Sequence, residues 1–114
     1  MVNDDLYLTL QQKTRELDVS VRSLRKNGNA YAEAERDYKV HLRQECLRLR
    51  DEGMAIGMID KVAYGIPSVA EKRFLRDVAK VTYEANQEAI NSIKLQMRLI
   101  EAQISREWST PQAN

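Results

Sequence analysis

The chain has 114 residues, of which 31% are charged, and its 18 basic and 17 acidic residues leave a formal net charge of +1. This balance provides no overall electrostatic attraction to nucleic acid or to an anionic membrane. A single cysteine excludes an internal disulfide, and only four Gly and two Pro are available for turns. The length suits one domain with a modest core.

The composition favours a helix-rich protein that stays in the reducing cytoplasm. Leu, Ala, Glu, Arg and Lys are abundant, as in coiled coils and long helices. No apolar run approaches the ~18 residues that span a bilayer, and no signal peptide is visible at Met1. We therefore expect a cytoplasmic protein without membrane contact.

The first predicted helix covers residues 4–26. Asn27-Gly28 predicts its end, because both residues tolerate the left-handed conformation that closes a helix, and Asn29 can cap the next helix. The apolar face steps by four and three residues through Leu10, Thr14, Leu17, Val21 and Leu24.

The second predicted helix covers residues 30–52 and ends at Gly53. Its stripe averages 3.6 residues per step through Tyr31, Ala34, Tyr38, Leu42, Cys46 and Leu49. The apolar connector that follows predicts a short helix over 55–63, which closes the end of a helical hairpin.

The third predicted helix is the most informative feature, because residues 69–108 contain no Gly or Pro. Ser68 and Glu71 have the spacing of a capping box, and Pro67 stands just outside it. Forty helical residues would measure roughly 60 Å, which exceeds any compact domain of this length. One end of this helix is therefore expected to need a partner.

Apolar residues of the third helix form more than one stripe in its second half. The main stripe runs through Leu75, Val78, Thr82, Ala85, Ala89, Ile93, Met97, Ile100 and Ile104. Ile90, Leu95 and Leu99 make the second half bulky around a wider arc, which predicts contact with two neighbours there. The fold class predicted from these elements is all-α, an antiparallel helical hairpin or three-helix coiled-coil-like bundle in one domain over 1–108, with a flexible tail over 109–114.

The predicted partner interface combines the far end of the third helix with the apolar stripe of the first. Because the third helix is too long for a compact domain, we expect the partner to be a second copy of the chain in a homodimer. Its residues are Ile90, Ile93, Met97, Ile100, Ile104, Trp108, Leu10, Leu17, Val21 and Leu24.

Besides the partner interface, clustered basic residues predict a nucleic-acid-binding surface, which could contact phosphates without reading base sequence. They lie on one side of the second helix and at the start of the third: Arg36, Lys39, Arg43, Lys72, Arg76 and Lys80. Neighbouring carboxylates could instead neutralise them as ordinary solvated flanks. A helix-turn-helix arrangement around the connector is disfavoured, because Asp60 stands where a small apolar residue normally packs.

Catalytic and metal-binding patterns are weak, so we expect a non-enzymatic protein without cofactor or metal. His41 and Cys46 differ by about 140° around a helix and do not converge on one metal or nucleophilic pair. Glu84 and Glu88 lie one turn apart, but the Glu-x-x-His pairs of helical metal sites are absent.

Several segments between residues 31 and 108 resemble a group of small helical proteins encoded by bacteriophages and prophages of Gram-positive bacteria. They are Tyr31-Ala-Glu-Ala-Glu-Arg-Asp-Tyr38, Leu47-Arg-Leu-Arg-Asp-Glu-Gly53, Val69-Ala-Glu-Lys72 with Arg76-Asp-Val-Ala79, and Arg98-Leu-Ile-Glu-Ala-Gln-Ile104 with Glu107-Trp108. The resemblance implies an early-region protein beside replication or recombination functions. It carries no catalytic residues, and it leaves open an accessory of replication or recombination, an inhibitor of a host factor, and a nucleic-acid-binding accessory.

Overall fold

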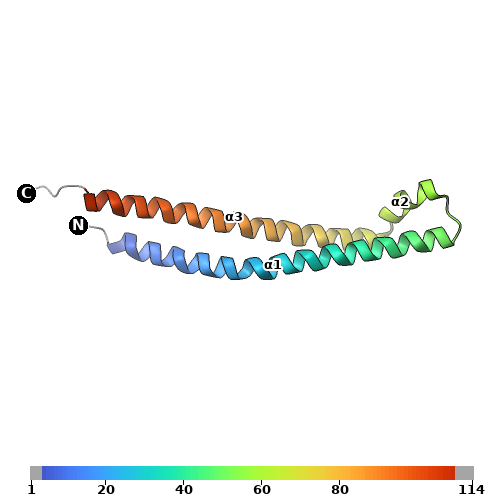
Figure 1. Cartoon of the computed structure of the whole chain (residues 1–114), viewed down its shortest axis with the longest axis horizontal. Helices are drawn as coiled ribbons and strands as arrows, with labels where there is room; N and C mark the ends of the chain where they lie inside the picture. The colour runs from blue at the N-terminus through green and yellow to red at the C-terminus, as the bar shows by residue number, and fades with distance from the viewer. Residues whose placement is uncertain (1–3, 110–114) are drawn as a thin grey trace, which may run out of the picture. The chain divides into compact units, whose positions relative to one another are not determined.

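The computed structural model describes residues 4–109, which form three α-helices and no strand (Figure 1). The helices are α1 (Asp4–Asp51), α2 (Ile56–Tyr64) and α3 (Pro67–Ser109). The described chain divides into two compact units, one of residues 4–25 with 85–109 and one of residues 26–84. Within each unit, α1 and α3 run antiparallel, which confirms the predicted all-α hairpin class. The predicted tail beyond Ser109 lies outside the described residues.

The predicted break between the first two helices is wrong, because α1 continues through Asn27, Gly28 and Asn29. A glycine inside a helix costs only about 1 kcal/mol relative to alanine, which neighbouring contacts can offset. Here it makes room for a neighbour: a Cβ at Gly28 would lie 3.0 Å from Cε1 of Tyr83. Gly28 therefore serves close packing of α1 on α3 and does not end the helix.

The turn after α1 follows the sequence prediction. Gly53 has a φ of 90°, the left-handed conformation that favours glycine, and the amide of Met54 donates to the carbonyl of Leu49. α3 begins two residues earlier than predicted, so Ser68 lies inside the helix and does not cap it. Its hydroxyl instead shares a hydrogen bond of 2.8 Å with Nε2 of His41.

The core of the second unit forms where α2 packs against the end of α1. Leu49, Ile59 and Ala63 are buried there, and Cys46 packs against them from α1 as predicted. Arg73 closes the corner between α2 and α3: its guanidinium donates to the carbonyl of Tyr64 and lies 3.7 Å from the centre of that ring. The corner is thus held by apolar burial and by a capped helix end.

The inner face in the first half of α1 is close to the predicted one and keeps three of its five residues. Counting back from buried Tyr38 in steps of four and three reaches Leu24, Ser20, Leu17, Lys13 and Leu10, all half-buried. Val21, predicted on this face, is 48% exposed. Because α1 is one helix, its second half fixes the phase of its first half.

The predicted stripe in the first half of the third helix is also wrong. Leu75 and Val78 are each 47% exposed, and Thr82, Ala85 and Ala89 are exposed as well. Val69, Ala79 and Tyr83 face inward instead, of which Val69 is fully buried. From Ile93 onward the stripe faces inward: Ile93, Met97 and Ile100 are half-buried and Ile104 is buried.

Candidate protein interaction surface

The outer face of α3 carries an apolar stripe that no described part of the chain covers. It runs in steps of four and three through Phe74, Val78, Val81, Ala85, Glu88, Ser92, Leu95 and Leu99, and every one of these residues is exposed. Phe74, Val81 and Leu99 expose 59%, 64% and 61% of their surface. We call this set the outer stripe; it has the heptad spacing by which helices pack on other helices.

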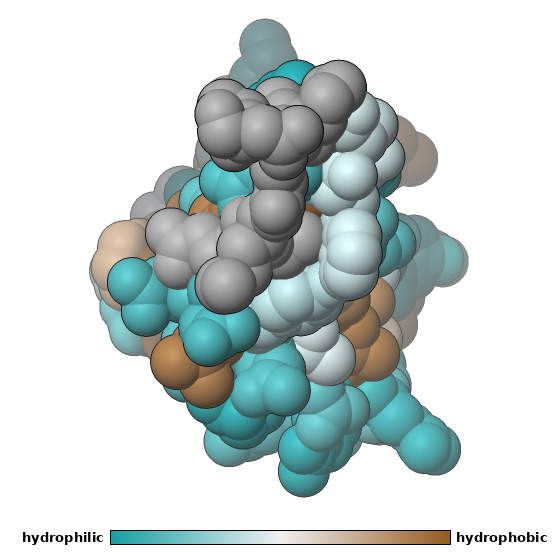
Figure 2. Space-filling model, turned by 90° about the vertical axis from the view of Figure 1, so that its left-hand side faces the viewer, coloured by the Kyte–Doolittle hydropathy of each residue, from teal (hydrophilic) through white to brown (hydrophobic). Residues whose placement is uncertain are grey.

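The matching outer face of α1 is much more polar. Counted with the same spacing from Leu8 to Glu33, it contains one further apolar residue, Val19, and every position is exposed. The remaining positions are polar or charged: Gln12, Arg15, Arg22, Lys26, Asn29 and Glu33. An uncovered apolar stripe is unfavourable in water, whereas a charged one is not. Figure 2, turned so that the left-hand side of Figure 1 faces the viewer, shows brown hydrophobic residues exposed among teal hydrophilic ones at this end of the described chain.

The predicted partner-interface residues divide into three groups in the structure. Ile90 and Ile104 are buried within the chain itself. Leu10, Leu17, Leu24, Ile93, Met97 and Ile100 are half-buried between α1 and α3 of the first unit. Val21 and Trp108 are exposed, and the indole of Trp108 donates to the hydroxyl of Tyr7 over 3.1 Å.

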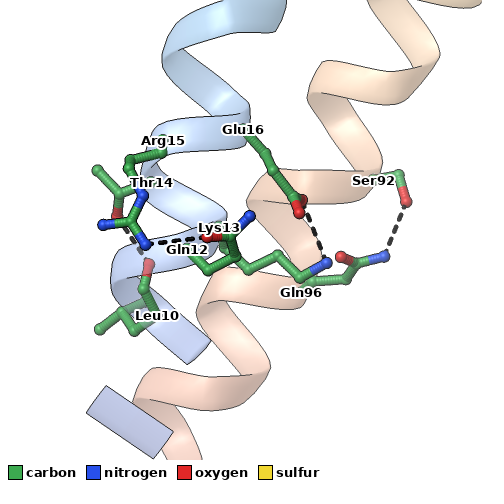
Figure 3. Close-up of polar contacts among 8 residues, drawn as sticks. All are labelled: Leu10, Gln12, Lys13, Thr14, Arg15, Glu16, Ser92 and Gln96. Atoms are coloured by element: carbon green, nitrogen blue, oxygen red, sulfur yellow. Dashed lines mark hydrogen bonds and ion pairs between the residues drawn. The ribbon is translucent and has the colours of Figure 1, made fainter. Parts of the chain in front are cut away.

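Polar side chains of the first unit find many partners within their own helix (Figure 3). The ammonium of half-buried Lys13 lies 3.2 Å from a carboxylate oxygen of Glu16, one turn along α1. On α3, the amide of Gln96 donates to Ser92 over 3.4 Å. These contacts satisfy the polar groups locally, so they do not specify a ligand.

Arg76 is a structural residue in this geometry. Its guanidinium lies 3.3 Å from Glu35 on α1 and 2.8 Å from Asp77, and it stacks 4.6 Å from the ring centre of Tyr38. Burial acts to lower the pKa of Arg76, but the two carboxylates outweigh it, and the pKa is raised. The side chain of Arg76, which was predicted to contact phosphates, is thus charged and engaged within the unit.

Two other predicted basic residues are also paired. Lys39 lies 3.5 Å from Glu35, and Arg36 lies 3.4 Å from Asp37. Both remain largely exposed, so these pairs are weak and open to competition. Lys80 is exposed on α3.

Two hollows in the second unit gather the remaining basic residues. Arg36, His41 and Lys72 line a hollow of about 400 Å³ between α1 and α3. Arg43 and Arg50 line another, of about 320 Å³, together with the carboxylate of Asp60 and with Cys46, Leu47, Ile56 and Ile59 as apolar neighbours. No ion pair of Arg43 or Arg50 is present within residues 4–109. Arg36 and Lys72 thus line one hollow, and Arg43 and Arg50 line the other.

Residues 4–109 contain no group of three or more His, Cys, Asp or Glu side chains arranged to hold a metal ion. The thiol of Cys46 lies 3.9 Å from Asp60, and His41 faces Ser68, so the two residues have different partners. Over the same range, no helix combines the length and apolar character needed to cross a bilayer.

The outer stripe was only partly predictable from the sequence. The bulk of Leu95 and Leu99 indicated a second neighbour for the end of α3, whereas Phe74 and Val81 were missed, because the main stripe was predicted to run through Leu75, Val78 and Thr82. Comparison with protein-family models found no matching family, and comparisons with curated proteins and with solved structures found no match.

Proposed function

We propose that this chain is a non-enzymatic, self-associating helical protein that acts through protein–protein contact. The observation that carries the proposal is the outer stripe of α3, whose Phe74, Val81 and Leu99 each leave more than half of their surface in water. Burying a side chain of this kind contributes about 1.5–3 kcal/mol, so several together provide enough free energy to associate.

The small internal core supports the same proposal. Only seven hydrophobic residues are buried among those described, and Val69 is the only large side chain that is fully buried. Two paired helices offer each other one face only, and the fixed backbone costs about 1–2 kcal/mol per residue. A further helical layer against α3 would supply the missing apolar burial.

Light scattering after size-exclusion chromatography tests the proposal. We expect an assembly of at least twice 13.2 kDa, and a Val81→Lys variant should shift the mass toward the monomer with unchanged helicity. Val19→Lys is the matched control, because Val19 is 59% exposed on the polar outer face of α1. A monomeric wild-type protein at high micromolar concentration would refute the proposal.

The biological role that we propose is that of a phage protein in the host cytoplasm, an accessory of replication or recombination or an inhibitor of a host factor. The sequence segments between residues 31 and 108 that resemble phage proteins support it. Affinity purification from the bacterial host should retain a partner with the wild-type chain and lose it with Val81→Lys. A partner captured equally by both would argue against the outer stripe as its binding surface.

A second candidate function is nucleic-acid contact, and one observation favours it: Arg43 and Arg50 flank a hollow without carboxylate partners among the described residues. Affinity for DNA should then fall steeply with salt. A double substitution of both to Glu should abolish it, while Lys26→Glu, at an exposed position of α1 away from this hollow, should not. Undetectable binding to single- and double-stranded DNA at low salt would eliminate this function.

A further inference from the structure

The outer stripe has a self-complementary order along α3. Bulky residues occur towards both ends, Phe74, Val78 and Val81 at one and Leu95 and Leu99 at the other, while Ala85, Glu88 and Ser92 between them are small or polar. All of them belong to one continuous helix, so helical periodicity places them on one face. Read in reverse, the stripe presents nearly the same pattern, which is the requirement for a two-fold symmetric contact.

We propose that the outer stripes of two copies pair in antiparallel orientation, with Phe74 of one copy facing Leu99 of the other and Val78 facing Leu95. The proposal rests on the self-association proposed above and names its geometry. By two-fold symmetry each contact occurs twice. At the centre, Glu88 faces the small Ala85, which leaves room for its carboxylate to reach solvent.

Charge decides against the parallel alternative. In a parallel in-register pair, each stripe residue faces its own copy, so two Glu88 carboxylates would meet on the seam. Like charges opposed in a partly dehydrated contact are destabilising. The antiparallel pair separates them.

Charge also favours this particular register. Asp77 precedes Val78 and Arg98 precedes Leu99, so both occupy the same flank of the stripe, and both are exposed. In an antiparallel pair like flanks face each other, which places Asp77 of one copy opposite Arg98 of the second. Asp77 accepts from Arg76 through Oδ1, which leaves Oδ2 for the second copy.

Neighbouring registers are worse on the same criteria. A shift by one heptad in one direction opposes Glu84 with Glu84 of the second copy. A shift in the other direction opposes Phe74 with Arg106 and leaves the largest apolar side chain of the stripe against a charge. That second shift also pairs Val81 with Leu99 and Glu84 with Arg98. The proposed register brings together more of the bulky apolar residues, because Phe74 then faces Leu99 and Val78 faces Leu95.

Disulfide trapping tests the geometry. In a Cys46→Ala background, Val78→Cys with Leu95→Cys should form a covalent dimer rapidly and nearly completely under mild oxidation. Val78→Cys alone should not, because the two copies of residue 78 would lie about 25 Å apart along the helix. Rapid crosslinking of the single Val78→Cys variant would show a parallel pair. Faster crosslinking of Val78→Cys with Ala102→Cys would show the shifted register in which Phe74 faces Arg106. Either result overturns the proposal.

Charge reversal gives an independent readout on the uncrosslinked protein. Asp77→Arg and Arg98→Asp should each raise the dimer dissociation constant about tenfold, and the double variant should restore most of the affinity. Glu84→Arg, combined with Arg98→Asp, is the control for the shifted register and should show no such rescue. A monomeric wild-type chain would refute self-association as a whole, whereas a dimer without Asp77–Arg98 coupling would refute only this geometry.

Discussion

Arg76 joins the two long helices of the second unit, so its truncation should destabilise the fold more than that of any exposed arginine. Its side chain is 21% exposed and that of Glu35 is 26% exposed. Exposed ion pairs stabilise a fold by about 0.2–1 kcal/mol, whereas removing one partner of a buried pair destabilises it by about 3–5 kcal/mol. We therefore assign a stabilisation of about 1–1.5 kcal/mol to the half-buried pair of Arg76 and Glu35. Stacking over Tyr38 adds about 0.5–1 kcal/mol.

We therefore expect Arg76→Ala to lower the free energy of unfolding by about 2 kcal/mol, or the melting temperature by about 8 °C. Urea unfolding followed by circular dichroism measures this, at one fixed protein concentration because association also contributes to stability. The single variant Glu35→Ala and the double variant complete a cycle, in which the coupling energy should be about 1 kcal/mol.

Arg36→Ala is the matched control, because Arg36 is 68% exposed and its pair with Asp37 lies on one helix surface. It should change stability by less than about 0.5 kcal/mol. If the Arg76–Glu35 coupling stayed below about 0.3 kcal/mol and both arginine variants behaved alike, the contact across the helices would not stabilise the fold.

Three further predictions concern packing and backbone. Gly57→Ala should stabilise α2 by a few tenths of a kcal/mol, since a Cβ there meets nothing within 4 Å. Gly53→Ala should instead destabilise the protein by about 1–2 kcal/mol, because Gly53 has a φ of 90°. The melting temperatures of the two variants should therefore shift in opposite directions. Val69→Ala should cost about 1.5–3 kcal/mol in urea unfolding, while Val81→Ala, 64% exposed, should leave the dilute protein's stability unchanged and weaken association instead. Gly28→Val should cost at least 1 kcal/mol by the same measurement, because an aromatic ring of α3 already lies 3.0 Å from the added Cβ.

The helical class and the ends of the helices around α2 were predictable, because they depend on local chemistry. Gly53 ends α1 as a left-handed residue, and no Gly or Pro interrupts α3 after its start. The inner face between Tyr31 and Leu49 was likewise readable, since its apolar residues keep one unambiguous period and are buried or half-buried in the structure.

The candidate surface was harder to predict, since α3 carries two apolar stripes in its first half and periodicity alone does not say which one is covered. The structure places Tyr83 and the stem of Arg76 against α1, and this choice turns Phe74, Val78 and Val81 outward.

The sequence by itself determined that this chain forms long amphipathic helices with an excess of apolar surface. Only the tertiary structure decided where that excess lies. Gly28 illustrates the physical reason. A glycine can end a helix, because it adopts the left-handed conformation readily. Here the ring of Tyr83 occupies the space that a side chain at this position would fill, so packing on α3 keeps α1 continuous. Continuity then fixes the phase of the inner faces, and the phase leaves the outer stripe of α3 in water.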